Sequence, residues 1–116
     1  MLYLSEVCLS FLGIFLMRER RQTMASADKL AEVFRILSSE ARVIIIQSLK
    51  RRGLCVTELT SQLGISQEAT SQHLRILKNA GIVKSQKRGF HVYYDFNKEN
   101  MAKLHKAVGE LLKLED

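Results

Sequence analysis

A run of side chains able to hydrogen-bond lies between residues 66 and 75 of the sequence. It combines hydroxyls, amides, a carboxylate, an imidazole and a guanidinium: Ser66, Gln67, Glu68, Thr70, Ser71, Gln72, His73 and Arg75. Amides and short polar groups can pair with the donors and acceptors on the edges of nucleic-acid bases. Ser66, Ser71 and Arg75 are better suited to phosphates. A short helix also carries polar residues when one of its faces is simply exposed to solvent. The surrounding elements must therefore distinguish a DNA-binding face from a solvated one.

Residue types used by hydrolases occur in the chain, but they do not form a catalytic pattern. The sequence contains no nucleophile elbow, no glycine-rich phosphate loop and no cluster with metal-ligand spacing. A chain of 116 residues also has little volume for a buried pocket. We therefore expect no enzyme activity, no cofactor and no metal. The two cysteines are too few for a disulfide scaffold, which favours a reducing, cytoplasmic location.

Apolar residues at helical spacing predict a helix over residues 26–37, and a second helix follows the cap Ser38-Ser39-Glu40 and ends before Gly53. A short helix capped by Thr57 is then expected to stop at Gly64. Ser66 caps a further helix over residues 67–80, which ends at Gly81. Short helices joined by Gly-Ile-Ser have the spacing of a helix-turn-helix, with a small core expected from Leu59, Leu63, Ile65, Ala69, Leu74 and Leu77.

After Gly81 the hydrophobic period changes from 3.6 to 2, which predicts strands over residues 82–86 and 91–96. The connection Lys87-Arg88-Gly89-Phe90 makes a basic hairpin, and a basic hairpin behind a helix-turn-helix is a wing. Lys87 and Arg88 at its tip are placed to reach a minor groove or its phosphates. A last helix starts after Asn97 and carries an apolar stripe that needs a covering surface, for which a second subunit is the natural candidate.

These elements predict a mainly α fold with a β-hairpin wing, a winged helix-turn-helix, over residues 25–116. The second helix of such a unit reads base edges in the major groove of double-stranded DNA. The formal net charge of +6 agrees with a polyanionic partner. We therefore expect DNA contacts from Ser66, Gln67, Thr70, Ser71, Gln72, His73, Arg75, Lys87 and Arg88. A winged helix that binds only proteins is the competing reading, although such domains usually lose the basic wing.

Residues 1–24 form a separate N-terminal apolar segment. The run from Leu2 to Met17 is shorter than a membrane span and carries Glu6, and its basic residues follow it, whereas a secretory signal has them in front. We therefore expect no membrane partner. An extra packed helix and a translation start at Met17 or Met24 both remain open, and a membrane-tethered regulator is the alternative.

Residues 65–83, ISQEATSQHLRILKNAGIV, resemble the recognition-helix stretch of the ArsR-type (ArsR/SmtB) repressor family. The likeness lies in the Ser-Gln start, the Ser-x-His-Leu centre and the exit, which is Ala-Gly-Leu-Val in the family and Ala-Gly-Ile-Val here. It extends over about residues 26–112. It implies a homodimer that binds a pseudo-palindromic operator, represses transcription and is released by an inducer. It also implies that the first and last helices form the interface, with Leu30, Phe34, Met101, Leu104, Val108 and Leu111 as the candidate contacts.

The metal sites of this family are not retained in the sequence. Where arsenic-type and cadmium-type members carry Cys-Val-Cys, this chain has Cys55-Val56-Thr57, and one thiolate cannot supply a soft-metal site. The zinc-type positions are occupied by Lys98, Asn100, Leu111 and Leu114. The resemblance therefore predicts the regulator but not its signal.

The two thiols leave one further possibility open. Some relatives complete the cysteine site from an N-terminal arm, and Cys8 lies in the extra segment of this chain. Cys8 and Cys55 could therefore form a two-thiolate site or a redox-switched disulfide. The alternative is that Cys55 is a small buried hydrophobe and Cys8 has no role.

Overall fold

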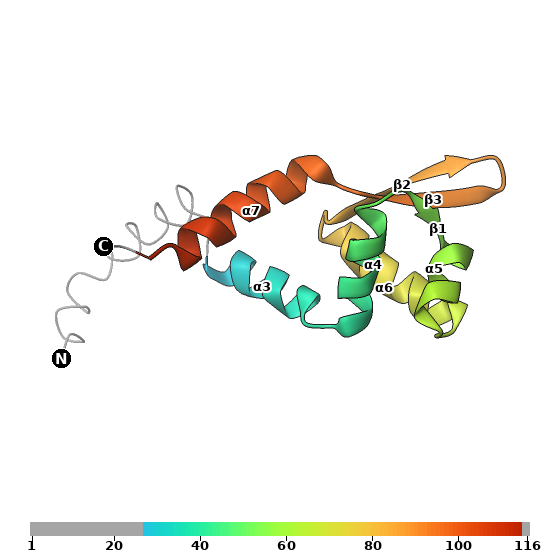
Figure 1. Cartoon of the computed structure of the whole chain (residues 1–116), viewed down its shortest axis with the longest axis horizontal. Coiled ribbons are helices and arrows are strands. Elements are labelled where there is room, and N and C mark those ends of the chain that lie inside the picture. Colours follow the sequence, from blue (N-terminus) through green and yellow to red (C-terminus); the bar gives the residue numbers. More distant parts are fainter. Residues whose placement is uncertain (1–26, 115–116) are drawn as a thin grey trace, which may run out of the picture.

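The computed structural model describes residues 27–114, so the expectations for residues 1–24 and for Cys8 fall outside the described part of the chain. The element order is α3 (Ala27–Leu37), α4 (Glu40–Leu49), β1 (Leu54–Cys55), α5 (Val56–Leu63), α6 (Gln67–Asn79), β2 (Val83–Arg88), β3 (His91–Phe96) and α7 (Lys98–Leu112). In Figure 1, α4, α5 and α6 gather at the base of the hairpin, and α3 and α7 both extend away from that group in the opposite direction to the wing. This arrangement is the expected winged helix-turn-helix.

Side-chain caps fix where most of the helices begin. Ser39 accepts from the Arg42 amide at 3.5 Å, Ser66 from the Ala69 amide at 3.1 Å, and Asn97 from the Asn100 amide at 3.2 Å. Each bond satisfies an amide that has no partner inside its helix, which is why these residue types start helices. The starts predicted after Ser39, Ser66 and Asn97 are confirmed.

The expected start of α5 was wrong. Thr57 lies inside the helix, and Cys55 is its N-cap. The Glu58 carboxylate accepts from the Cys55 amide at 3.0 Å and from Arg52 at 3.2 Å. A carboxylate three residues after the cap closes the reciprocal half of a capping box, so the helix begins one turn ahead of Glu58. The backbone bond to Cys55 is also the main reason that the pKa of Glu58 lies below its ordinary value.

The sheet has three antiparallel strands in the order β1-β3-β2. In β2 and β3 the register runs from Val83 opposite Phe96 to Arg88 opposite His91. The predicted loop was too long, because Lys87 and Arg88 belong to β2 and only Gly89 and Phe90 form the turn. The strand β1 was not predicted; it pairs Leu54 with Tyr94 and Cys55 with Tyr93. A strand of two residues has no period for a sequence pattern to reveal.

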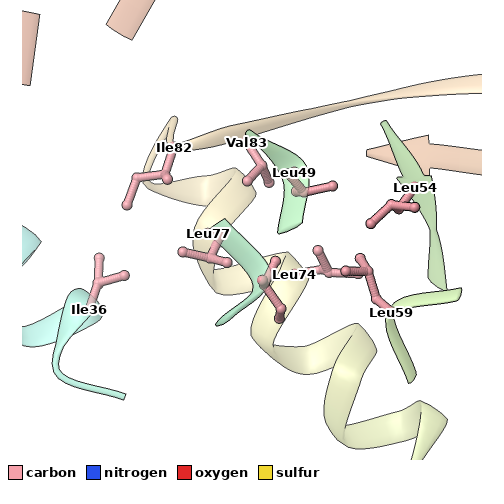
Figure 2. Close-up of a cluster of buried hydrophobic side chains, with 9 residues drawn as sticks. Ile36, Leu49, Leu54, Leu59, Leu74, Leu77, Ile82 and Val83 are labelled. Atoms are coloured by element: carbon pink, nitrogen blue, oxygen red, sulfur yellow. The ribbon is translucent and has the colours of Figure 1, made fainter. Parts of the chain in front are cut away.

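Nine buried apolar side chains form one core beneath the recognition elements: Ile36, Ile45, Leu49, Leu54, Leu59, Leu74, Leu77, Ile82 and Val83. Figure 2 shows Leu74 and Leu77 on α6 with Leu49, Leu54 and Leu59 gathered near them. Leu59, Leu74 and Leu77 are thus core residues as predicted, whereas Leu63, Ile65 and Ala69 are only half-buried. The packing holds α6 by its inner face and leaves the other face free. Within residues 27–114, no helix is long and apolar enough to cross a membrane.

Candidate nucleic-acid interface

The turn between α5 and α6 orients the second helix. Gly64 ends α5 with a φ of 66°, and its amide donates to the Thr60 carbonyl at 3.0 Å. A left-handed residue at this place favours glycine, because a side chain there would be strained. Ser66 then caps α6 within two residues. The tight connection, together with the shared core, makes α5 and α6 one rigid unit.

The outer face of α6 forms an open groove, and its lining among residues 27–114 comes from that helix: Gln67, Glu68, Ser71, Gln72 and Arg75. All of these except the half-buried Ser71 are exposed. Four of the predicted DNA-contacting residues, Gln67, Ser71, Gln72 and Arg75, therefore share one surface. Ser66, at the start of the helix, is exposed as well. The surface offers amide donors and acceptors together with the Glu68 carboxylate and the positive charge of Arg75. The amides are suitable for hydrogen-bonding base edges, and Arg75 for a nearby phosphate.

Thr70 was expected on this face, and that expectation was wrong. Its side chain is completely buried, and its hydroxyl donates to the Ser66 carbonyl at 3.0 Å. Residues 70, 74 and 77 follow the i, i+4, i+7 spacing of one helix face, so Thr70 lies on the core side with Leu74 and Leu77. That spacing was visible in the sequence. Thr70 therefore belongs to the packing of α6 and cannot present its hydroxyl to DNA.

His73 was also expected to face solvent, but it is half-buried and contacts Arg42 of α4. The Arg42 Nε donates to His73 Nδ1 at 3.1 Å, and its Nη1 donates to the Ile36 carbonyl at 3.2 Å. Arg42 thus joins the end of α3 to the middle of α6. No periodicity could reveal this link, because Arg42 and His73 are 31 residues apart in the chain.

Burial, followed by the charge of Arg42, lowers the pKa of His73 below its ordinary value of 6.5. The unfolded chain then takes up a proton at a pH where the folded chain does not. The contribution of His73 to stability is therefore present above about pH 6.5 and is lost as pH falls through the lower folded pKa.

We expect His73→Gln to flatten this pH dependence, because an amide oxygen can accept from Arg42 without titrating. The measurement is the denaturant midpoint of the wild type and the variant between about pH 7.5 and about pH 5.5. Gln47→Ala, a non-titrating change at an exposed position of α4, is the control and should keep the wild-type slope. An unchanged slope in His73→Gln would contradict the assignment.

The wing presents exposed cations close to its tip. Lys87 and Arg88 are both exposed at the end of β2. The Arg88 guanidinium lies 5.7 Å from the centre of the Tyr93 ring and donates to the Gln86 side chain at 3.4 Å. Stacking on Tyr93 restricts the arginine side chain while leaving its charge available to a phosphate. Both residues are therefore accessible, as the wing prediction requires.

The predicted interface residues lie on helices that the core covers only in part. Leu30, Met101, Leu104 and Val108 are half-buried. Phe34 is 41% exposed and Leu111 is 54% exposed, and no residue of α7 is buried. An apolar stripe left in this state is typical of a surface covered by another chain. The interface itself stays a prediction.

Cys55 is a free, half-buried thiol at the start of α5. No group of three or more potential metal ligands gathers among residues 27–114. Asn100 occupies one of the zinc-ligand positions of the family that the sequence resembles. Its side-chain Nδ2 donates a hydrogen bond to the Gly81 carbonyl at 3.0 Å. This bond ties the first turn of α7 to the exit of α6. Pairing of Cys55 with Cys8 stays a prediction.

Known proteins are similar to this chain in sequence and in fold. Residues 39–85 match the family described as bacterial regulatory protein, arsR family. The transcriptional repressor SmtB homolog of Synechocystis sp. is 31% identical over 94 residues, which cover 81% of this chain and 71% of that protein. An HTH-type transcriptional regulator of Methanocaldococcus jannaschii is 35% identical over 89 residues, covering 76% of this chain and all of that protein.

Among solved structures, an ArsR-like transcriptional regulator from Rhodococcus sp. RHA1 superposes with a TM-score of 0.65 at 30% identity. The alignment covers 72% of this chain and 79% of that one. The family match over residues 39–85 includes the helix-turn-helix and the residues that line the groove on α6. The chain therefore belongs to the arsR family of regulatory proteins, which are DNA-binding transcriptional regulators and not enzymes.

Proposed function

We propose that this protein is a homodimeric, sequence-specific repressor that binds a pseudo-palindromic operator in the cytoplasm and is released by an inducer. The observation that carries the proposal is the polar groove on α6, because the opposite face of that helix is fixed in the core. A rigidly held helix presents its side chains at set positions, as base readout requires. The SmtB homolog of Synechocystis sp., which is described as a transcriptional repressor, supports repression as the sign of regulation.

Within the groove, the side chains divide by chemistry. The amides of Gln67 and Gln72 can each donate and accept, so they are assigned to base edges, with adenine the usual bidentate partner. Arg75 and Ser71 are assigned to phosphates. Ser66 uses its oxygen to cap the Ala69 amide, but its hydroxyl proton remains able to donate to a phosphate oxygen. Phosphate contacts fix the register in which the glutamines meet the bases.

A second copy of the chain supplies the partner for α3 and α7. Covering α3 and α7 removes from water the large apolar side chains that these helices leave exposed, which are Phe34, Leu111 and Leu112. A two-fold axis through this interface places the two recognition helices about 34 Å apart, one turn of B-form DNA. Each wing then lies beside its own recognition helix and brings Lys87 and Arg88 to the flanking backbone.

The proposal is tested by titrating the full-length protein against its own upstream promoter DNA and against an unrelated duplex. Both titrations are run at about 50 and about 200 mM salt, because phosphate contacts alone weaken steeply over that range. We expect tight, promoter-selective binding that survives the higher salt. Equal, weak binding to both duplexes that collapses with salt would contradict a sequence-specific regulator.

Two substitutions in the groove should have different signatures. Arg75→Ala is expected to weaken binding to every duplex and to reduce the salt slope by about one. Gln72→Ala is expected to lose promoter selectivity by about 1–3 kcal/mol with an unchanged salt slope. Gln47→Ala, exposed on α4 and outside the groove, is the control and should bind like the wild type. Matching losses in all three variants would contradict the assigned roles.

A further inference from the structure

Phe90 lies at the tip of the wing with its side chain completely exposed. Among residues 27–114 it is the most exposed large apolar side chain, at 101%. It follows Gly89, whose φ is 63°, in a turn of two residues. A positive φ at the first turn residue alone is the pattern of a type II′ hairpin turn, which closes tightly between antiparallel strands. The turn therefore holds the phenyl ring at the end of the extended hairpin seen in Figure 1.

The hairpin does not shield this ring with its own side chains. Tyr93 is the aromatic residue that its neighbours contact: Arg88 lies over its ring, and the His91 ring meets it edge-on at 6.4 Å. Lys87, Arg88 and His91 are all exposed on the two strands beside the turn. Phe90 is thus an apolar projection set between basic side chains. This combination complements a partner with an anionic surface and an apolar interior.

We propose that Phe90 inserts between adjacent base pairs from the minor groove of operator DNA while Lys87 and Arg88 bind the phosphates on either side. The proposal rests on the proposed function and adds a contact to it. Apolar wedges such as Phe enter base steps in this way, partly unstack them and bend the duplex. Flexible pyrimidine–purine steps unstack most readily. The wedge therefore adds a preference for such a step at the operator flank, without a hydrogen bond to a base edge.

A membrane of anionic lipids also has an anionic surface and an apolar interior, but the structure favours DNA as the partner. Interfacial membrane binding relies on an extended apolar face, commonly that of an amphipathic helix. Here a single ring projects, and the half-exposed Val92 is the next apolar residue along β3. The ring also belongs to the wing of a helix-turn-helix, where duplex DNA is already within reach.

The first test compares Phe90→Ala with Val92→Ala, which removes a neighbouring apolar side chain from the same wing. Full-length proteins are titrated against a duplex that the wild type has selected from a random library, with fluorophores on the duplex ends to report bending. We expect Phe90→Ala to bind about tenfold more weakly, the scale of one lost aromatic–base stack, and to abolish most of the bend. Its salt slope should stay unchanged because no charge is removed. Val92→Ala should match the wild type in affinity and in bending.

The second test uses the absence of tryptophan from the chain. Phe90→Trp introduces a single indole, whose emission should fall on binding the selected duplex as it stacks on bases, and which should become protected from acrylamide. Val92→Trp should keep its emission and its acrylamide access. Wild-type affinity and bending in Phe90→Ala, or an indole that stays accessible in Phe90→Trp, would overturn the wedge and leave the proposed function intact.

Two further outcomes would also overturn the proposal. If the wild type selects no duplex, the proposed function fails together with the wedge. If Phe90→Trp changes its emission with anionic phospholipid vesicles and not with the duplex, the ring serves a membrane surface instead. The wedge is supported only when the duplex, and not the vesicle, protects the indole.

Discussion

Leu111→Glu is expected to leave the chain monomeric and to weaken binding to a two-half-site operator by at least about a hundredfold. Leu111 is 54% exposed on α7, a helix that has no buried residue of its own. In the proposed dimer this side chain is covered by the partner, so a glutamate there would place a charge in an apolar interface without a counter-ion. A monomer also loses the gain from engaging both half-sites at once.

Light scattering on a sizing column measures the mass of the variant, and titration of a duplex with one or two half-sites measures its affinity. Lys106→Gln is the matched control, because it changes the net charge by the same amount at an exposed polar position on the same helix. The control should remain a dimer and bind like the wild type. A dimeric Leu111→Glu with wild-type affinity would show that α7 is not the interface.

Leu74→Ala is expected to lower the free energy of unfolding by about 3 kcal/mol, within the range seen for leucine truncation in a closed core. Leu74 is completely buried at the centre of α6, in the core that contains Leu59 and Leu77. Truncation removes apolar contacts and leaves a cavity that the surrounding helices cannot fully close. This loss is a large share of the total free energy of unfolding, because a domain of this size is only marginally stable.

Chemical denaturation of the two proteins gives the difference directly. The neighbouring Arg75→Ala is the control for stability, because Arg75 is exposed and its removal should change the unfolding free energy by less than about 0.5 kcal/mol. The pair should separate cleanly, with Leu74→Ala affecting folding and Arg75→Ala affecting DNA binding. A Leu74→Ala change as small as that of Arg75→Ala would contradict the packing that holds α6 in place.

The sequence predicts most of the fold because its signals are local. Helical spacing and the caps Ser39, Ser66 and Asn97 identify four of the helices. The glycines at 64, 81 and 89 mark the end of α5, the end of α6 and the turn of the wing. The helix-turn-helix and the wing follow from the order of these elements. Gln67, Ser71, Gln72 and Arg75 lie on one surface because a helix repeats every 3.6 residues.

The features that were missed depend on contacts across the chain. The strand β1 exists only because Leu54 and Cys55 pair with Tyr94 and Tyr93. The Arg42–His73 bond joins different helices, so no local pattern announces it. Thr70 is a different case, because its polar type suggested solvent while its spacing with Leu74 already placed it in the core. At that position the spacing was the better guide, since a threonine hydroxyl can be buried when it donates a hydrogen bond to a carbonyl of its own helix, as Thr70 does to Ser66.

Hydroxyl-radical footprinting of the protein on its selected duplex, read together with interference by 7-deazaadenine substitution, which removes the major-groove N7 acceptor of adenine, tests most directly whether α6 of a dimer reads DNA. The account predicts two protected patches on one face of the duplex, centred about one helical turn apart, with interference at major-groove positions inside each patch. It also predicts that the Gln72→Ala variant loses that interference while keeping the backbone protection. A single unphased protection, or interference unchanged by Gln72→Ala, would contradict the central claim.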